Sequence, residues 1–341
     1  MEVCPNCFND KELSGFISSS VKIGTCGICR SHDVRLLDIV ELLDFFQELV
    51  NNFQTSAGGT KLISIIRKDW KFFKSDQIAV EILNNVLPNL STDIKFPEEL
   101  VAYTDDINEN LNYWDTLKDE LKWQQRFLSD ISYLEDLGWD GFFNTQFELT
   151  PKHELFRGRV HHQSGLNAYN EDEMMCPEPR MAKGGRANPS GIPYLYLCDN
   201  QDTVLYEIRA SYLDELSIGT FRLKSKYVST KIVDFTEETS LYQPARVNET
   251  IKASLLRERI SRDLSKPMRR YDSEIEYIPT QFICEFIRIF TGASGIQFRS
   301  SLHPPGKNIV MFDQEYMECK QVLLKKVSRV NLEAVNSSHT L

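Results

Sequence analysis

Residues 184–197 read GGRANPSGIPYLYL and mark the clearest change of pattern in the chain. Glycine and proline dominate up to the second proline, and tyrosine and leucine alternate after it. The alternation predicts a strand over Pro193–Cys198, in which Tyr194 and Tyr196 share one face. Thr203–Ile208 follows closely and is expected to begin the next element. This stretch therefore indicates mixed α/β structure.

The rest of the second half continues that pattern. Short β-rich runs between glycine and proline predict strands, and two longer periodic runs predict helices. The strands are expected at Phe221–Val228, Lys231–Phe235, Gly295–Arg299 and Asn308–Phe312, and the helices at Glu249–Leu264 and Thr280–Phe290. Val160–Pro193 has little periodicity, and a loop of that length in a compact domain is often functional.

The residues before Thr150 have a mainly helical pattern. Leu36, Ile39, Leu43 and Phe46 fall at helical spacing, and the pattern continues to Val50. Further helices are expected at Lys61–Phe73, Gln77–Leu87, Asn108–Lys122 and Gln124–Leu137, with a turn at Asn51–Thr60. The predicted fold class is α+β: a zinc knuckle (1–35) and a helical domain (36–145), followed by a mixed α/β domain (146–330).

Four of the eight cysteines lie in two tight pairs. Cys4 and Cys7 form one Cys-x2-Cys pair, and Cys26 and Cys29 form the other. Four thiolates make the tetrahedral set that Zn²⁺ prefers in a structural site, where no coordination position stays open. His32 lies close enough to replace one ligand. A redox pair, or four unrelated reduced cysteines, are the alternatives.

The charge of the chain is unevenly distributed. The 341 residues carry a formal net charge of −10, with 41% hydrophobic and 26% charged residues, which is ordinary globular composition. Residues 1–150 have a net charge of −12 and residues 151–341 a net charge of +2. Nucleic acid is therefore an unexpected partner, whereas the second half could still bind a phosphate-bearing anion. No secretory signal or membrane span is apparent, so we expect a cytoplasmic location and no membrane partner.

Several common catalytic motifs are missing from the sequence. There is no Gly-x-Gly-x-x-Gly after a strand, no Gly-x-Ser-x-Gly and no His-Glu-x-x-His. His161 and His162 are adjacent rather than four residues apart, which makes them a poor metal clamp. Nicotinamide Rossmann binding, the serine-hydrolase elbow and zincin chemistry are therefore not indicated.

Three groups of residues in the second half carry a family resemblance. They are Phe156–Arg159, then Gly184–Leu197 with Tyr206–Arg209, then Tyr277–Gln281 with Gly295–Ser301 and Asn308–Phe312. In order and local context they resemble the RES domain family, named for its Arg, Glu and Ser, over about residues 150–325. The front half resembles the HEPN-like helical region found ahead of RES domains in one subgroup. The Arg-x4-6-His motif of HEPN ribonucleases is absent, so we infer no RNase.

The RES resemblance implies an ADP-ribosyltransferase-like fold that acts on NAD⁺. It also implies which residues of this chain act. They are Arg157, Glu207 and Ser300 as catalytic residues, and Tyr196, Arg186, Arg159 and Ser301 as substrate-binding residues. Arg159 is the alternative to Arg157, two positions away, and the two are expected on the same face of a strand. Ser301 is the alternative to Ser300.

The chemistry of NAD⁺ cleavage agrees with these residue types. Breaking the nicotinamide–ribose bond builds positive charge on the sugar, which a carboxylate such as Glu207 stabilises. Arginines bind a pyrophosphate bidentately, which suits Arg157 and Arg186. The ring of Tyr196 can stack on nicotinamide, and the hydroxyl of Ser300 can position a ribose hydroxyl or a phosphate.

The expected function is an NAD⁺ glycohydrolase or phosphorylase. RES proteins are typically toxins of toxin–antitoxin pairs, so a toxin role, with a place in phage defence, is implied. NAD⁺ is the expected substrate, structural Zn²⁺ the expected cofactor, and an antitoxin protein and a second copy of the chain the expected partners. The alternatives are a protein ADP-ribosyltransferase and an inactive RES-like binding module.

Overall fold

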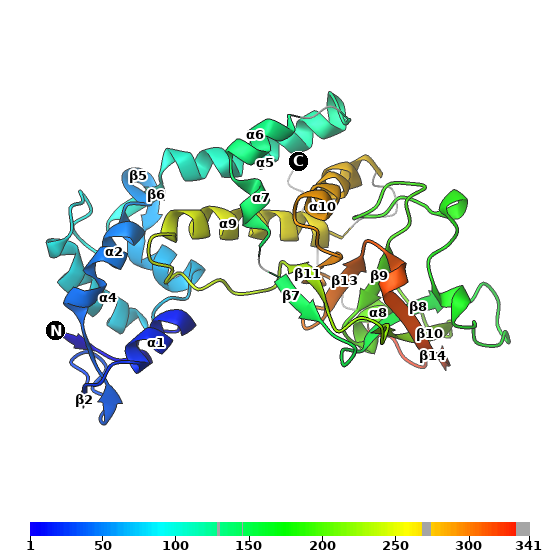
Figure 1. Cartoon of the computed structure of the whole chain (residues 1–341), viewed down its shortest axis with the longest axis horizontal. Helices are drawn as coiled ribbons and strands as arrows, with labels where there is room; N and C mark the ends of the chain where they lie inside the picture. Colours follow the sequence, from blue (N-terminus) through cyan, green and yellow to red (C-terminus); the bar gives the residue numbers. More distant parts are fainter. Residues whose placement is uncertain (128–129, 145, 268–273, 332–341) are drawn as a thin grey trace. The chain divides into compact units, whose positions relative to one another are not determined.

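The computed structural model describes residues 1–127, 130–144, 146–267 and 274–331 (Figure 1). The chain divides into two compact units, Met1–Leu117 with Glu238–Leu256 and Lys118–Glu237 with Arg257–Leu341. In the described part of the chain, no helix has both the length and the apolar composition needed to span a bilayer. The three-part division at residues 35 and 145 stays a prediction.

The first unit is mainly helical with small strand pairs. Its helices are α1 (Lys11–Ser18), α2 (Leu43–Val50), α3 (Leu62–Ser64), α4 (Asp76–Val86), the first part of α5 (Asp105–Trp123) and the first part of α9 (Val247–Ser265). Its strands are β1 (Glu2–Val3) with β4 (Leu37–Asp38), β2 (Ile23–Gly24) with β3 (Val34–Arg35), and β5 (Phe53–Lys61) with β6 (Leu100–Tyr103). The helices predicted around Leu43, Gln77 and Asn108 are confirmed.

The predicted turn at Asn51–Thr60 is wrong. Most of it belongs to β5, which pairs antiparallel with β6 and shifts register along its length. At Gly59 the two backbones approach so closely that an added Cβ would lie 2.2 Å from the carbonyl oxygen of Val101. Glycine at this position therefore allows the two strands to approach closely. The pairing with β6, about 40 residues away in the sequence, overrides the local turn propensity.

The second unit is built on one large mixed sheet. Its order is β14-β10-β8-β9-β13-β12-β11-β7, and every neighbouring pair is antiparallel except the parallel pair β11 and β12. The strands are β7 (Gln146–Leu149), β8 (Leu155–Val160), β9 (Leu195–Cys198), β10 (Glu215–Leu223), β11 (Thr230–Asp234), β12 (Gly295–Arg299), β13 (Lys307–Met311) and β14 (Met317–Lys326). The predicted fold class is confirmed: a helical region with a cysteine cluster comes first in the sequence, and a mixed α/β region follows it.

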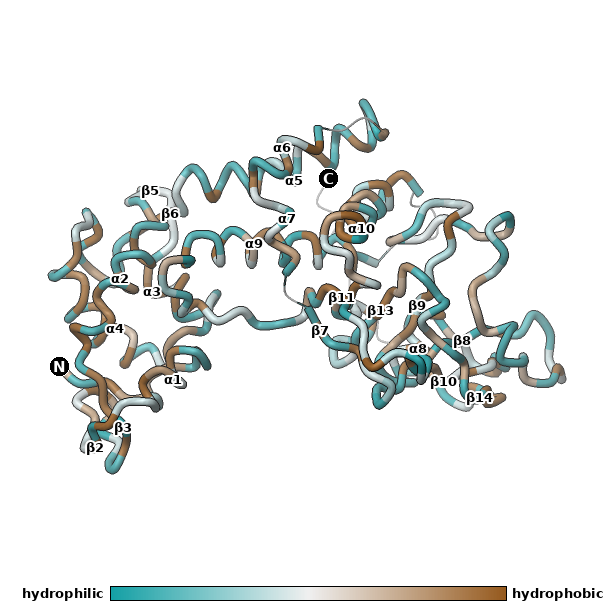
Figure 2. Tube along the Cα trace, in the orientation of Figure 1, coloured by the Kyte–Doolittle hydropathy of each residue, from teal (hydrophilic) through white to brown (hydrophobic). Residues whose placement is uncertain are grey.

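Helices accompany this sheet in the second unit. They are the last part of α5, α6 (Ile131–Asp136), α7 (Trp139–Phe142), α8 (Gln201–Glu207), the last part of α9 and α10 (Ile278–Phe290). The helices predicted at Glu249 and Thr280 are confirmed. Of the helix predicted at Gln124–Leu137, α6 is observed, and residues 128–129 lie outside the described part. Figure 2 shows α10 as largely hydrophobic, and its side chains from Ile283 to Ile287 are mostly buried.

The two faces of β8 have different neighbours. An added Cβ on Gly158 would lie 2.5 Å from Val204 of α8, so this face of the strand packs closely against that helix. Side chains alternate along a strand. Leu155, Arg157 and Arg159 therefore share the opposite face, where Leu155 joins the buried core of the sheet.

Candidate functional site

A carboxylate held by two side chains lies at the end of α8. Glu207 is the last residue of that helix, which begins where Asn200 accepts a hydrogen bond from the backbone of Thr203. The Oε1 atom of Glu207 accepts from Ser300 Oγ and from Asn308 Nδ2, each at 2.7 Å. These contacts join residues 93 and 101 positions apart in the sequence. With Oε1 doubly engaged, Oε2 is the carboxylate oxygen left for a ligand.

The hydroxyl of Ser300 has its direction fixed. Its Oγ accepts the backbone N–H of His303 at 3.0 Å while it donates to Glu207. Ser301, the adjacent residue, instead donates to the carbonyl of Ser265 at the end of α9. The structure thus gives the two serines different partners, and Ser300 is the one joined to the carboxylate.

Arg186 lies near the carboxylate of Glu207. Its Nη1 donates to the carbonyl of Leu264 at 2.6 Å, which satisfies one of the last carbonyls of α9. Burial lowers the pKa of Arg186, and the nearby Tyr277 and Glu207 act in the opposite direction. Arg186 therefore interacts electrostatically with the carboxylate of Glu207.

Tyr196 supports the loop that carries Arg186. Its hydroxyl donates to Asn188 Oδ1 at 2.7 Å and accepts from the backbone N–H of Ala187 at 3.0 Å. Burial raises the pKa of this hydroxyl well above its usual range. From α10, Thr280 donates to the carbonyl of Arg186 at 2.6 Å. The hydroxyl of Tyr196 thus holds the turn, and only its partly buried ring could meet a ligand.

Arg157 and Arg159 point away from α8, on the other face of β8. Arg159 Nη2 donates to the carbonyl of Met175 at 2.8 Å. Arg157 Nη1 is buried and has no hydrogen-bond partner within the described residues. Burial lowers the pKa of Arg157, and Cys176 beside it acts to raise it. The structure therefore brings Glu207, Ser300 and Arg186 together, and places both β8 arginines under the loop that holds Met175 and Cys176.

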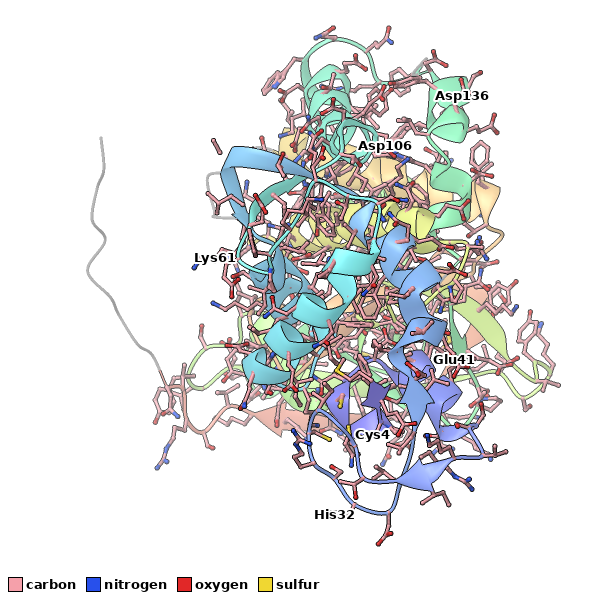
Figure 3. All side chains as sticks on the ribbon, turned by 90° about the vertical axis from the view of Figure 1, so that its left-hand side faces the viewer. Cys4, His32, Glu41, Lys61, Asp106 and Asp136 are labelled. Atoms are coloured by element: carbon pink, nitrogen blue, oxygen red, sulfur yellow. The ribbon has the colours of Figure 1, made fainter. Side chains whose placement is uncertain are left out.

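The four N-terminal sulfurs form a second polar centre, in the first unit. Cys4, Cys7, Cys26 and Cys29 all bring their Sγ atoms within 4.8 Å of one another. The Sγ atoms of Cys4 and Cys29 are 3.4 Å apart, and those of Cys7 and Cys26 are 3.6 Å apart. Figure 3 shows sulfur atoms gathered beside Cys4, with His32 at the tip of the adjoining loop. This set fits a tetrahedral Zn²⁺ ion, and His32 bonds to Thr25 instead.

The protonation of these thiols depends on their surroundings. Burial raises the pKa of Cys4 to about 12 and raises that of Cys7 further. Burial acts in the same direction on Cys29, but hydrogen bonds from Ser31 outweigh it and lower the pKa to about 7. A cation would have to displace protons from the buried thiols, which a divalent metal does when it binds thiolates.

Three residues of the site escaped the sequence analysis. Asn308 binds the carboxylate of Glu207, and Thr203 and His303 lie beside it. The one available signal was Asn308, a polar residue at the start of the apolar run Ile309–Phe312. His303 and Thr203 carry no pattern that separates them from other polar residues.

The fold and the site define a mixed α/β domain with a polar site around one carboxylate. In the sequence, this domain follows a helical region with a four-thiol cluster. The family model of the RES domain matches residues 158–331, about half of the chain. The chain belongs to the RES domain family.

The similarity of the chain to individual proteins is low. One similar solved structure is the crystal structure of the M. tuberculosis MbcT–MbcA toxin–antitoxin complex, at 14% identity and a TM-score of 0.30. The match covers 55% of this chain and 88% of that one, and similarity this low carries no argument about function. No curated protein sequence matches the chain.

Proposed function

We propose that the chain is an NAD⁺-cleaving enzyme, a glycohydrolase or phosphorylase that acts as a toxin. The observation that carries the proposal is the hydrogen bond from Ser300 to Glu207, within a RES domain. It joins, at 2.7 Å, two of the three residue types from which the family takes its name, although they are 93 positions apart.

The proposed chemistry assigns each group a task. Glu207 presents Oε2 to the ribose, where it stabilises the positive charge that develops as nicotinamide leaves. Ser300 and Asn308 hold Oε1, so that the carboxylate does not rotate. Arg186 is the proposed group for the pyrophosphate, with Tyr196 and Ser301 as further substrate contacts. The sequence assigns the pyrophosphate to Arg157 and Arg159 as well, but these two lie on the face of β8 opposite α8, so their part in substrate binding stays a prediction.

The same proposal extends to the cofactor and the partners. Cys4, Cys7, Cys26 and Cys29 would hold a structural Zn²⁺, which stabilises the N-terminal region and takes no part in turnover. An antitoxin protein and a second copy of the chain are the proposed macromolecular partners. A cytoplasmic location and a role in phage defence are part of the same proposal.

The test is incubation of the purified full chain with NAD⁺. We expect release of free nicotinamide without labelling of protein. Glu207→Gln should lower the rate by at least about 100-fold, because general acid–base and electrostatic groups each contribute factors of this size. Glu178→Gln, at an exposed glutamate, is the matched control and should match the wild type.

Each other outcome contradicts the proposal in its own way. Labelled protein in place of free ADP-ribose or its phosphate would show a transferase. Intact NAD⁺ under all conditions would leave a binding module. Undiminished turnover by a folded Glu207→Gln variant would refute the site.

A further inference from the structure

His303 lies beside the Glu207 site, yet the proposed function gives it no task. It belongs to the loop between β12 and β13, and its backbone N–H donates to Ser300 Oγ at 3.0 Å. Its Nδ1 lies 2.9 Å from Thr203 Oγ1. Its ring stacks on Tyr206, with centroids 4.9 Å apart and planes 8° apart. Gly306 closes the loop tightly against Thr203.

The hydrogen bonds around Thr203 fix the tautomer of His303. Asn200 donates its Nδ2 to Asp199 at 2.7 Å, so its Oδ1 is the acceptor. Thr203 must therefore donate its hydroxyl proton to Asn200 Oδ1, 2.9 Å away. The hydroxyl oxygen of Thr203 is then an acceptor toward the imidazole, so Nδ1 of His303 carries the proton. In the neutral ring, the lone pair consequently resides on Nε2.

The imidazole of His303 lies against the helix that carries the carboxylate. Thr203 and Glu207 are four residues apart on α8, so they lie on one face of the helix, about 6 Å apart. His303 contacts the first, and Ser300 of the same loop contacts the second. Tyr206, which stacks on the imidazole, is 52% exposed, so solvent reaches this side of the site.

We propose that His303 Nε2 is the proton acceptor for the water that attacks the ribose. This inference rests on the proposed function and selects hydrolysis over phosphorolysis. The C1′–N bond of NAD⁺ breaks, and its electron pair leaves with neutral nicotinamide. The water oxygen bonds to C1′, and its proton passes to Nε2 and then to solvent, giving ADP-ribose, nicotinamide and H⁺.

The choice of water follows from the chemistry of the acceptor. Water becomes a strong nucleophile only as it loses a proton, so a base beside the sugar accelerates its attack. Inorganic phosphate already carries negative charge and gains little from such a base. In glycoside hydrolysis, direct attack by water likewise relies on a general base that activates the water molecule.

The test uses two substitutions in the full chain, His303→Gln and His303→Phe. Both keep the backbone N–H that binds Ser300, and the phenylalanine also keeps an aromatic ring against Tyr206. We expect each variant to lose at least about 100-fold in nicotinamide release into water. Sodium azide should restore release in both, because azide is an anion that attacks C1′ without losing a proton.

The outcomes separate a proton acceptor from a packing residue. Wild-type turnover by His303→Phe would overturn the inference, and so would a lost activity that azide fails to restore. His162→Gln, at an exposed histidine, is the control and should behave as the wild type. If the wild-type chain itself releases no nicotinamide, the proposed function fails and this inference fails with it. If only the variants behave unexpectedly, the proposed function stands.

Discussion

At the scale of single residues, neighbours in the sequence have separate tasks. Ser300 and Ser301 are adjacent and chemically identical, but one binds the carboxylate of Glu207 and the other binds the end of α9. The backbone turns after β12, so consecutive side chains point to different elements. Sequence alone could not separate the two serines, because the distinction depends on partners that are distant along the chain.

Asn308 offers a prediction at this scale. Asn308→Leu keeps a similar volume but removes the amide that donates to Glu207 Oε1 at 2.7 Å. A hydrogen bond to a charged group contributes about 1.5–3 kcal/mol, so the rate of NAD⁺ cleavage should fall about 10-fold to 100-fold. Steady-state kinetics on nicotinamide release measures it, with exposed Asn112→Leu as control. An unchanged rate would show that Ser300 alone orients the carboxylate.

At the scale of elements, α8 is placed by its contact with β8. Gly158 lets the helix approach the strand, and the opposite face of the strand carries Arg157 and Arg159. The sequence predicted that these two arginines share one face of a strand, and β8 confirms it. The same glycine therefore places the Glu207 helix on one side of the strand and both arginines on the other.

Gly158→Ala tests that contact. Its Cβ would lie 2.5 Å from Val204 and 3.0 Å from Ile208, so the helix must shift. Overpacking of this kind costs about 1–3 kcal/mol, and the free energy of unfolding should fall by that amount. Gly15→Ala is the control, because Gly15 lies in α1 with no atom within 4 Å of an added Cβ. It should gain about 0.5–1 kcal/mol. Denaturant unfolding measures the free energy of unfolding of both variants and of the wild type. A Gly158→Ala variant as stable as the wild type would refute the close contact.

At the scale of the whole molecule, the charge asymmetry matches two kinds of structure. The acidic first half forms helices and a thiol cluster, and the near-neutral second half forms the large sheet. The four clustered cysteines fall in the first unit, and the seven residues proposed for the NAD⁺ site fall in the second. Metal loss should therefore affect stability more than chemistry.

Zinc removal tests this separation. We expect one Zn²⁺ per chain by elemental analysis, and none in Cys26→Ser, because buried thiolates require the metal that replaces their protons. Chelation should lower the melting temperature of the chain while nicotinamide release per folded molecule persists. Cys319→Ser is the control, since that cysteine belongs to β14 and is far from the four clustered cysteines in the sequence. A fully loaded Cys26→Ser protein would contradict the four-thiolate site.

The sequence by itself determined many of the elements, the pairing of the cysteines and the resemblance to the RES family. The spacing of the two Cys-x2-Cys pairs, the alternation in Pro193–Cys198 and the order of the three residue groups that resemble the family can all be read along the chain. The sequence pattern mistook β5 for a turn and left β7 and β14 unpredicted, because strand pairing is a contact between distant segments. It also missed the short helix α1.

Only the tertiary structure decided which polar groups meet. Glu207 finds Ser300 and Asn308 because α8 and the loop after β12 converge on the same side of the sheet. His303 gains a defined tautomer from a chain of hydrogen bonds that begins at Asp199. Hydrogen bonds act over about 3 Å, so their partners are set by folded geometry and not by spacing along the chain.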